Sequence, residues 1–199
     1  RLVVVVLSTA VGLAGVAAVA AAQDSSRIMQ ERKAATRSVV ETALSVVQFY
    51  GDEAKAGRMT DAEAQKAAKA EVAALRYGDG KGYFWINDMT PTMVMHPIDP
   101  SLNGADLSGK TDPDGKHLFM DMVKVVEADG AGFMEYQWPK PGVDAPQPKV
   151  SYVAGYEPWG WIIGSGVYVD DVQAAAFSDL RVLALSALAI LVVVAGLTT

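Results

Sequence analysis

Three cationic side chains lie beside aromatic residues in this sequence, and they are its best candidates for binding chemistry. Arg76 precedes Tyr77, His96 ends an apolar run, and Lys149 lies shortly before Tyr152. If these cations met on one concave surface, they would donate hydrogen bonds to a small carboxylate, with tyrosine hydroxyls and a tryptophan wall around it. The chemistry predicted is non-covalent binding of an organic anion.

Each cation also has a purely structural interpretation. Arg76 at the end of a helix would interact favourably with the helix dipole. His96 would be a hydrogen-bonded histidine of the core or sheet edge, and Lys149 a solvated residue at a strand end. The tryptophans fit a core or a membrane interface equally well. The residues alone leave both interpretations open.

Composition gives little support to other functional classes. The 199 residues carry a formal charge of -6 and include no cysteine. The absence of cysteine excludes disulfides, thiolate metal sites and a cysteine nucleophile. No G-x-S-x-G, H-E-x-x-H or Walker A motif is present. No basic cluster indicates nucleic-acid binding. We therefore expect no enzyme activity, no cofactor and no nucleic-acid partner.

A metal site is not predicted either. Four acidic residues lie in the segment "DPSLNGADLSGKTDPDG", which does not match the EF-hand template. The two histidines lack the spacing of metal ligands. Solvated loop carboxylates are the favoured interpretation of these residues: Asp99, Asp106, Asp112 and Asp114.

The candidate residues lie in a region that reads mainly as strands. "YFWIN" and "TMVMH" flank a turn, and "GFMEYQWP", "KVSYVAGYE" and "WGWIIGSGVYV" follow, with "KPGVDAPQP" interpreted as a proline-rich turn. Between the two groups, residues 97–116 read as a long loop, a length that is often functional. Five strands joined mostly by hairpins predict one antiparallel sheet with helices on its faces, an α+β fold.

Helical patterns surround these strands. Residues 23–50 carry apolar side chains at helical spacing without proline or glycine. Thr60 and Glu63 form a predicted capping box for a helix that continues to Arg76. The glycines of "YGDGKG" then interrupt it, and a third helix spans 117–130, ending at Gly130.

Two uncharged segments, 2–22 and 182–199, are predicted to be transmembrane helices. They place residues 24–179 outside the inner membrane as an extracytoplasmic domain. The first segment has an alternative as a signal peptide, because "AVAAAQD" resembles a cleavage site, although the apolar run is longer than usual. A chain that begins without Met and ends in a span is expected to be a piece of a longer protein.

Two longer stretches resemble a known family. "YGDGKGYFWINDMTPTMVMHPIDPSLNGADLSGKTDPDGK" and "PKVSYVAGYEPWGWIIGSGVYVDDV" are similar to the single-Cache sensor domain, type 2. Such domains occur in bacterial methyl-accepting chemotaxis proteins and some sensor histidine kinases. The resemblance spans roughly residues 30–172. Its most specific parts are "YFWI", "MHP", "SY" and "EPWGWIIGSGVYVDD".

The resemblance implies a PAS-like sheet of five antiparallel strands packed on a long N-terminal helix. It implies a chemoreceptor that binds a small organic acid, such as acetate, propionate, lactate or pyruvate. It also implies a periplasmic domain anchored in the inner membrane, a homodimer, and cytoplasmic signalling domains after Thr199. A histidine kinase or cyclase output remains an alternative, and a membrane-anchored enzyme a weaker one.

The resemblance carries ligand contact to seven positions: Arg76, Tyr77, Tyr83, Trp85, His96, Lys149 and Tyr152. An anion bridging Arg76 and Lys149 would then shift the sheet against the long helix. Alternation along a strand places Tyr83 and Trp85 on one face but Lys149 and Tyr152 on opposite faces. Either a bulge redirects Lys149, or only one of that pair contacts the ligand.

Overall fold

The computed structural model describes residues 2–170, with side chains from residue 26 onward. The element order is α1 (Leu2–Lys55), α2 (Asp61–Ala74), β1 (Trp85–Asp88), β2 (Met93–Met95), α3 (Leu118–Asp129), β3 (Ala131–Lys140), β4 (Val143–Tyr156) and β5 (Trp161–Tyr168). Short 3-10 turns span Pro100–Leu102 and Glu157–Trp159. The segment Lys33–Val169 forms one compact unit.

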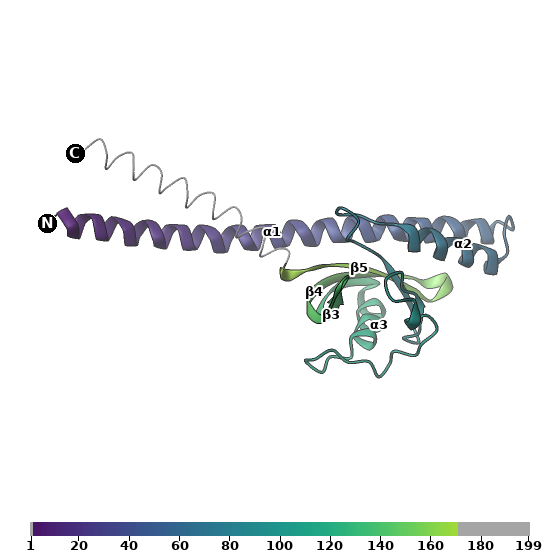
Figure 1. The fold of residues 1–199 in the computed structure, drawn as a ribbon. Helices are drawn as coiled ribbons and strands as arrows, with labels where there is room; N and C mark the ends of the chain where they lie inside the picture. Colours follow the sequence, from purple (N-terminus) through teal and green to yellow (C-terminus); the bar gives the residue numbers. More distant parts are fainter. Residues whose placement is uncertain (1, 171–199) are drawn as a thin grey trace. The chain divides into compact units, whose positions relative to one another are not determined.

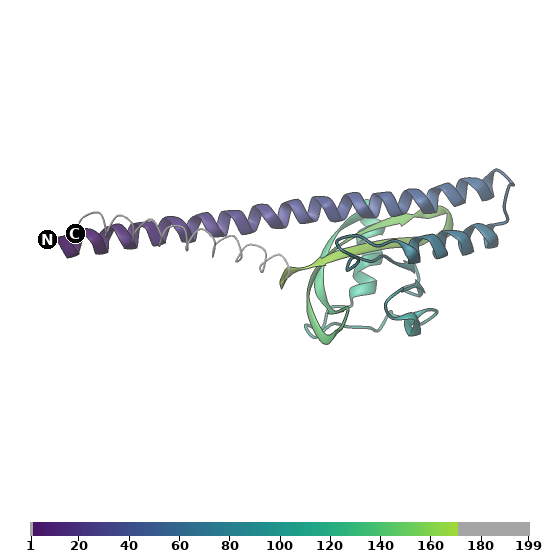
Figure 2. The same ribbon diagram turned by 45° about the horizontal axis from the view of Figure 1, so that its top comes forward.

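The five strands form one sheet in the order β2-β1-β5-β4-β3, and every pairing is antiparallel. This confirms the predicted α+β fold. Within the compact unit, α1 and α2 run side by side over one face and α3 covers the other (Figures 1 and 2). The capping box also forms: the Thr60 hydroxyl accepts from the Glu63 amide, and the Glu63 carboxylate accepts from the Thr60 amide.

Each face of the sheet has its own apolar core. The helix-pair core lies between the sheet and α1/α2, and consists of these buried residues: Val40, Ala43, Val47, Ala68, Val72, Phe84, Ile86, Met95, Tyr152, Ala154, Trp161 and Ile163. The α3 core lies on the opposite face: Tyr83, Trp85, Met93, Leu107, Leu118, Phe119, Met122, Val123, Tyr136, Val153 and Ile162. In β1, β4 and β5, alternation along the strand therefore decides which core a residue joins, whereas Met93 and Met95 of β2 join opposite cores beside a register shift.

The predicted proline-rich turn is wrong over most of its length. Only a tight turn near Gly142 links β3 to β4, and β4 already begins at Val143. Residues 143–148 pair with β3 alone, since β4 pairs with β5 only from Lys149 onward. With one side of the strand unpaired, Pro146 and Pro148 need not donate to a second neighbour, and so a strand tolerates them.

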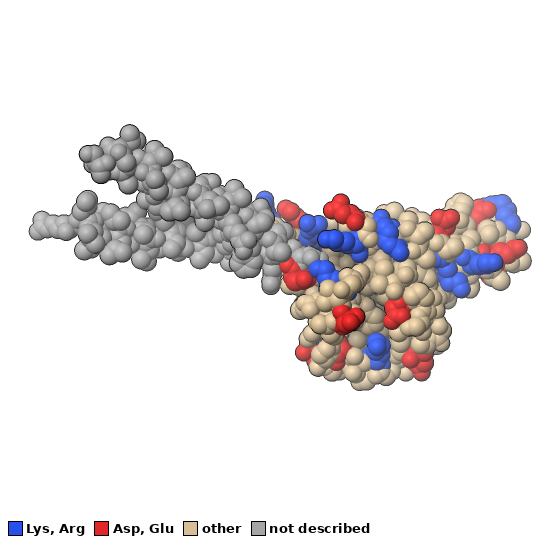
Figure 3. Space-filling model, in the orientation of Figure 1, with Lys and Arg blue, Asp and Glu red and all other residues tan. Residues whose placement is uncertain are grey.

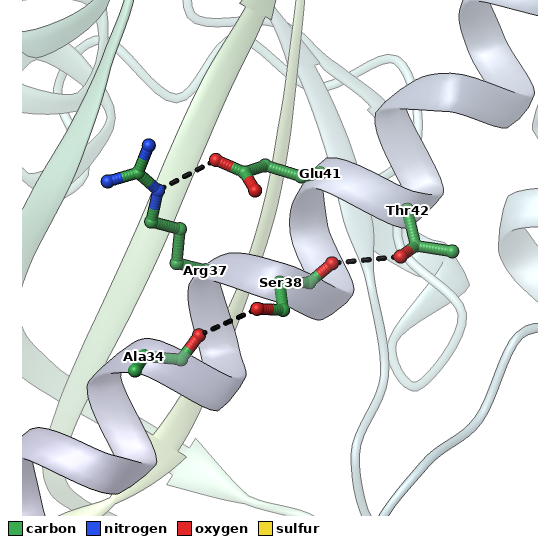
Figure 4. A network of polar contacts seen from close by, with 5 residues as sticks. All are labelled: Ala34, Arg37, Ser38, Glu41 and Thr42. Atoms are coloured by element: carbon green, nitrogen blue, oxygen red, sulfur yellow. Dashed lines mark hydrogen bonds and ion pairs between the residues drawn. The ribbon is translucent and has the colours of Figure 1, made fainter.

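Exposed polar residues of α1 bond to one another along the helix (Figure 4). Arg37 Nε lies 2.7 Å from Glu41 Oε1 in an i, i+4 ion pair, and the hydroxyls of Ser38 and Thr42 donate to carbonyls four residues earlier. On the face drawn in Figure 3, acidic and basic side chains of the described residues are mixed. This pattern is typical of a solvated surface.

The predicted membrane segments are not tested by this structure. Residues 182–199 lie outside the described residues, as do the side chains of 2–22 and the end of the predicted domain, 171–179. In the part that is described, no helix combines the length and apolar character needed to cross a membrane.

Candidate functional site

A small cavity lies between the sheet and α3, within the α3 core. Its volume is about 10 Å³, close to the space of one water molecule and far below the roughly 300–1,000 Å³ typical of pockets for drug-sized ligands. Nine residues from four strand regions and α3 line it: Tyr83, Trp85, His96, Leu118, Phe119, Met122, Tyr136, Trp138 and Lys149. All except Trp138 are buried. A ligand of even a few heavy atoms therefore requires these walls to move apart.

A wider cleft lies where α1 ends, beside Tyr156 and Trp159. Its carboxylates, Asp52 and Asp61, are solvent-exposed, and no charged side chain among its lining residues is buried. The smaller cavity contains buried charge and several donors, and it is therefore the candidate site.

Lys149 is the charged centre of the cavity. Its side chain is only 2% exposed, and its ammonium donates to the Tyr83 hydroxyl at 3.0 Å. The rings of Tyr83, Trp85 and Tyr168 lie 4.5, 5.0 and 5.1 Å from Nζ. Among the described residues it forms no salt bridge within 4.0 Å. Aromatic faces compensate a buried cation only in part, so an anion would complete this site.

His96 supplies a neutral donor. Its Nδ1 accepts the backbone N–H of Asp99 at 2.9 Å, and a neutral imidazole that accepts at Nδ1 carries its hydrogen on Nε2. Burial, reinforced by the positive charge of Lys149, lowers the pKa of His96 to about 4, although Asp99 opposes the shift. The ring is therefore neutral at physiological pH and carries one N–H donor, on Nε2, in a side chain that lines the cavity.

The lowered His96 pKa predicts acid sensitivity of the fold. The unfolded histidine titrates near 6.5 and the folded one near 4, so the unfolded state binds more protons between these values. The contribution is fully present above about pH 6.5 and is lost as pH falls toward 4, at about 3 kcal/mol in total. Urea unfolding at pH 7.0, 5.5 and 4.5 should show that His96→Asn, whose amide oxygen replaces Nδ1, has lost this slope.

The second histidine provides the control for that measurement. His117 is exposed, and its ring nitrogen contacts the Ser108 carbonyl at 3.3 Å. His117→Asn should keep the wild-type dependence on pH. If both variants kept the wild-type slope, the neutral state of His96 would not contribute to stability.

Tyr83 and Trp85 share one face of the sheet, as alternation predicted, and both line the cavity. The Tyr83 hydroxyl accepts the Lys149 hydrogen bond, and its ring lies 5.3 Å from the His96 ring. Trp85 Nε1 donates to the Asn87 side chain at 3.1 Å, which fixes the indole against the sheet. Four predicted residues are therefore brought together: Tyr83, Trp85, His96 and Lys149.

The other three predicted residues lie outside the cavity. Tyr152 is in the helix-pair core and packs on Phe133 with ring centroids 4.7 Å apart. The β4–β5 register is regular from Lys149 to Tyr156, so no bulge turns Tyr152 toward Lys149. Tyr77 bonds to the Ser165 hydroxyl at 2.6 Å. Arg76 is exposed and donates to the Ala73 and Leu75 carbonyls, which matches its structural interpretation at a helix end.

Five lining residues were not among those predicted from the sequence. Tyr136 pairs directly with Lys149 across the β3–β4 ladder, and Trp138 lies two residues further on the same face. Leu118, Phe119 and Met122 share the buried side of α3. The hairpin register would have identified the first two residues, but the sequence placed "KPGVDAPQP" in a turn and so obscured that register.

Three side-chain hydrogen bonds fasten the long loop before α3 to the outer edge of β3, and the buried one is made by Asp112. Asp112 is 7% exposed. One of its oxygens accepts the backbone N–H groups of Asp114 and Lys116 at 2.9 and 3.0 Å, and the other accepts that of Gln137 at 3.0 Å. From the same loop, the ammonium of Lys110 lies 5.7 Å from the centroid of the Trp138 ring. The loop therefore packs against the one partly exposed wall of the cavity.

Comparison with known proteins places this architecture in a sensor family. The chain is 48% identical over 154 residues to methyl-accepting chemotaxis protein McpP of Pseudomonas putida, a match covering 77% of this chain and 28% of that protein. It is 32% identical over 157 residues to sensor histidine kinase MctS of Rhizobium johnstonii, covering 77% and 33%. The chain thus spans about a third or less of these relatives.

Solved structures agree. A periplasmic sensor domain of a chemotaxis protein matches with a TM-score of 0.70 and 51% identity, covering 72% of this chain and 99% of that one. A structure described as the basis for carboxylic acid recognition by a Cache chemosensory domain matches with a TM-score of 0.69 and 46% identity, covering 72% and 97%. These findings confirm the resemblance. The single Cache domain 2 model matches residues 28–181, and the chain belongs to that family.

Proposed function

We propose that this chain is the ligand-binding region of a transmembrane chemoreceptor and that its ligand is a small monocarboxylate with two to four carbon atoms. One observation carries the proposal: the Lys149 ammonium is almost fully buried, with no salt-bridge partner among the described residues. A buried charge is costly unless it is paired. A carboxylate bound beside it would supply the missing charge.

The composition of the cavity favours a single carboxylate group. Lys149 is its one lining cation, and no lining residue carries a carboxylate. A second carboxylate on the ligand would lie against Leu118, Phe119 or Met122 without a counterion. An amino acid would bring an ammonium group that has no acidic partner there. Lys149 and the Nε2–H of His96 would bind the carboxylate, and the aromatic walls would enclose a short alkyl chain.

This picture limits the affinity that can be expected. The best small ligands gain at most about 1.5 kcal/mol per heavy atom. For the heavy atoms of acetate, two carbons and two oxygens, this sets a limit of about 6 kcal/mol, or a Kd of roughly some tens of micromolar. Submicromolar binding of acetate would contradict a site of this kind.

The relatives support the receptor context. The stronger match is to a chemotaxis protein, while the weaker match to a histidine kinase keeps a kinase output as the alternative. In the proposed arrangement, segments 2–22 and 182–199 span the inner membrane, residues 24–179 lie in the periplasm, and the receptor is a homodimer. Ligand binding must favour one conformation of the sheet over another in order to signal. The chain beyond β5 would carry that change toward the second span.

A thermal-shift screen tests the proposal. Segment 24–179 suits it, because it contains nearly all of residues 28–181, which match the single Cache domain 2 model. Acetate, propionate, lactate and pyruvate should raise the Tm by mass action, whereas succinate and alanine should not. No shift with any monocarboxylate, despite a cooperative melt, would remove the proposed ligand class. Chemical conversion of a bound acid over time, followed by NMR, would instead indicate an enzyme.

A further inference from the structure

Two glycines of β5 lie under the ligand cavity. Gly164 and Gly166 are on the α3 side of the sheet, while Ser165 between them faces α1 and α2 and bonds to Tyr77. Neither glycine has the positive φ angle that favours this residue, and glycine in a strand interior is destabilising in itself. A requirement for space, not for backbone conformation, therefore explains them.

Different groups occupy the space that a side chain at Gly164 or at Gly166 would need. A Cβ atom at Gly164 would lie 2.3, 2.6 and 2.8 Å from three atoms of the Trp85 indole, Cζ2, Cε2 and Cη2. At Gly166 it would lie 2.2 Å from the Ser151 hydroxyl, 2.6 Å from the Val150 carbonyl oxygen and 3.0 Å from Lys149 Cε. The missing side chain at Gly164 thus makes room for the Trp85 side chain and for no backbone atom within reach, whereas a side chain at Gly166 would also meet the rigid backbone of Val150.

The indole has one direction in which to move if the space at Gly164 is filled. β5 is a central strand, paired with β1 on one side and β4 on the other, so its backbone cannot retreat from the ring. The Trp85 Nε1 bond to Asn87 fixes the pyrrole edge. The six-membered ring would have to lift away from the sheet by about 1 Å to restore ordinary contact at 3.4 Å or more. That movement is into the cavity.

We infer that Gly164 determines which acids the site accepts, because it lets the Trp85 indole lie against the sheet and so leaves the most room for the ligand's alkyl chain once the walls part. This inference rests on the proposed function, since it concerns the size of a ligand that the Lys149 site binds. The carboxylate end of the ligand is served by Lys149 and His96 and is not affected directly. A bulkier residue at Gly164 therefore penalises longer acids more than acetate.

The test is a change of preference, measured by calorimetric titration of the full chain with acetate, propionate and butyrate. In Gly164→Ala, the ratio of the butyrate Kd to the acetate Kd should rise about tenfold over the wild type. Gly155→Ala is the matched control: it adds the same methyl group to a neighbouring strand, 2.5 Å from Val126 Cγ1, outside the ligand cavity. It should lower the Tm without changing the ratio.

A second variant approaches the same contact from the other side. Trp85→Phe shortens the ring without touching Gly164, so the ratio should fall below the wild-type value. Combined with Gly164→Ala, it should restore a ratio near that of the wild type, because the smaller ring removes the overlap. This arm remains informative if Gly164→Ala does not fold.

The outcomes separate the two proposals. If the wild type binds none of the three acids, the proposed function fails, and this inference fails with it. If the wild type binds them but Gly164→Ala weakens all three equally, or Gly155→Ala changes the ratio as much, the inference about Gly164 is overturned and the carboxylate site stands.

Discussion

Lys149→Met is expected to abolish carboxylate binding while the domain remains folded. The ammonium is the one lining cation, so its loss leaves a bound carboxylate buried without a counterion. Truncating one partner of a buried charged pair costs about 2–5 kcal/mol. A value of about 3 kcal/mol corresponds to a Kd more than about 100-fold weaker. Calorimetric titration with acetate measures this loss directly.

The stability of the ligand-free protein should change in the opposite sense. Methionine is similar in length to lysine and lies well against the rings of Tyr83, Trp85 and Tyr168. Replacing a buried charge by an apolar side chain of similar volume is often neutral or stabilising. The free energy of unfolding, from urea titration without acid, should therefore be unchanged or higher than that of the wild type.

Arg76→Met provides the control, since it removes another candidate cation at a position outside the cavity. Among the described residues its guanidinium bonds to carbonyls near the end of α2 and to no other group, so acetate affinity should stay within about twofold of the wild type. Equal losses in both variants would restore the anion bridge between Arg76 and Lys149. Near-normal binding by Lys149→Met would remove Lys149 from the site.

Much of the fold could be predicted because local signals agree with tertiary packing. The capping box at Thr60, the αL glycine that ends α3 at Gly130, and the alternating strands all act within a few residues. The length of β4 could not be read in the same way. Pro146 and Pro148 indicate a turn locally, and only their position beside a single neighbouring strand makes them compatible with a sheet.

In the candidate site, too, some residues can be predicted from local sequence and others depend on tertiary contacts. Alternation alone separates Lys149 from Tyr152, and the regular register of β4 with β5 confirms that they lie on opposite faces. Tyr136 and Trp138 depend on a ladder between distant segments, and the α3 residues depend on which face of the sheet that helix covers. Such contacts are set by tertiary structure, and periodicity in one segment cannot identify them.

The second large effect concerns the loop that packs against the cavity: Asp112→Ala should lower the free energy of unfolding by about 2–3 kcal/mol. Three backbone N–H groups share this carboxylate, from Asp114, Lys116 and Gln137. A hydrogen bond to a charged group contributes about 1.5–3 kcal/mol, and water can replace part of what the exposed loop amides lose. Asp106→Ala is the control, because in the described part of the chain that exposed carboxylate bonds only within its own turn, to Ser108.

The loss should depend on pH with a defined sign. Burial by itself would raise the pKa of Asp112, but the N–H groups of Gln137, Lys116 and Asp114 outweigh burial and lower it. The folded carboxyl therefore holds its charge at a lower pH than the unfolded one, and the contribution is fully present above about pH 4. It is lost as pH falls through the lowered folded value. The gap between wild type and Asp112→Ala should be complete at pH 7 and should shrink below pH 4.

Hydrogen exchange of the Gln137 amide can test this attachment at one atom. Gln137 lies on β3, an edge strand, opposite Pro148, and its N–H points to Asp112 instead of to another strand. Without the carboxylate this amide would face water, so its exchange should accelerate by at least tenfold, while amides bonded between β4 and β5 change only as far as global stability falls. If Gln137 stayed as protected as in the wild type, the loop would be held to the sheet by its other contacts, including the hydrogen bonds of Lys116 and Asp114 to β3, and Asp112 would shape only its own turn.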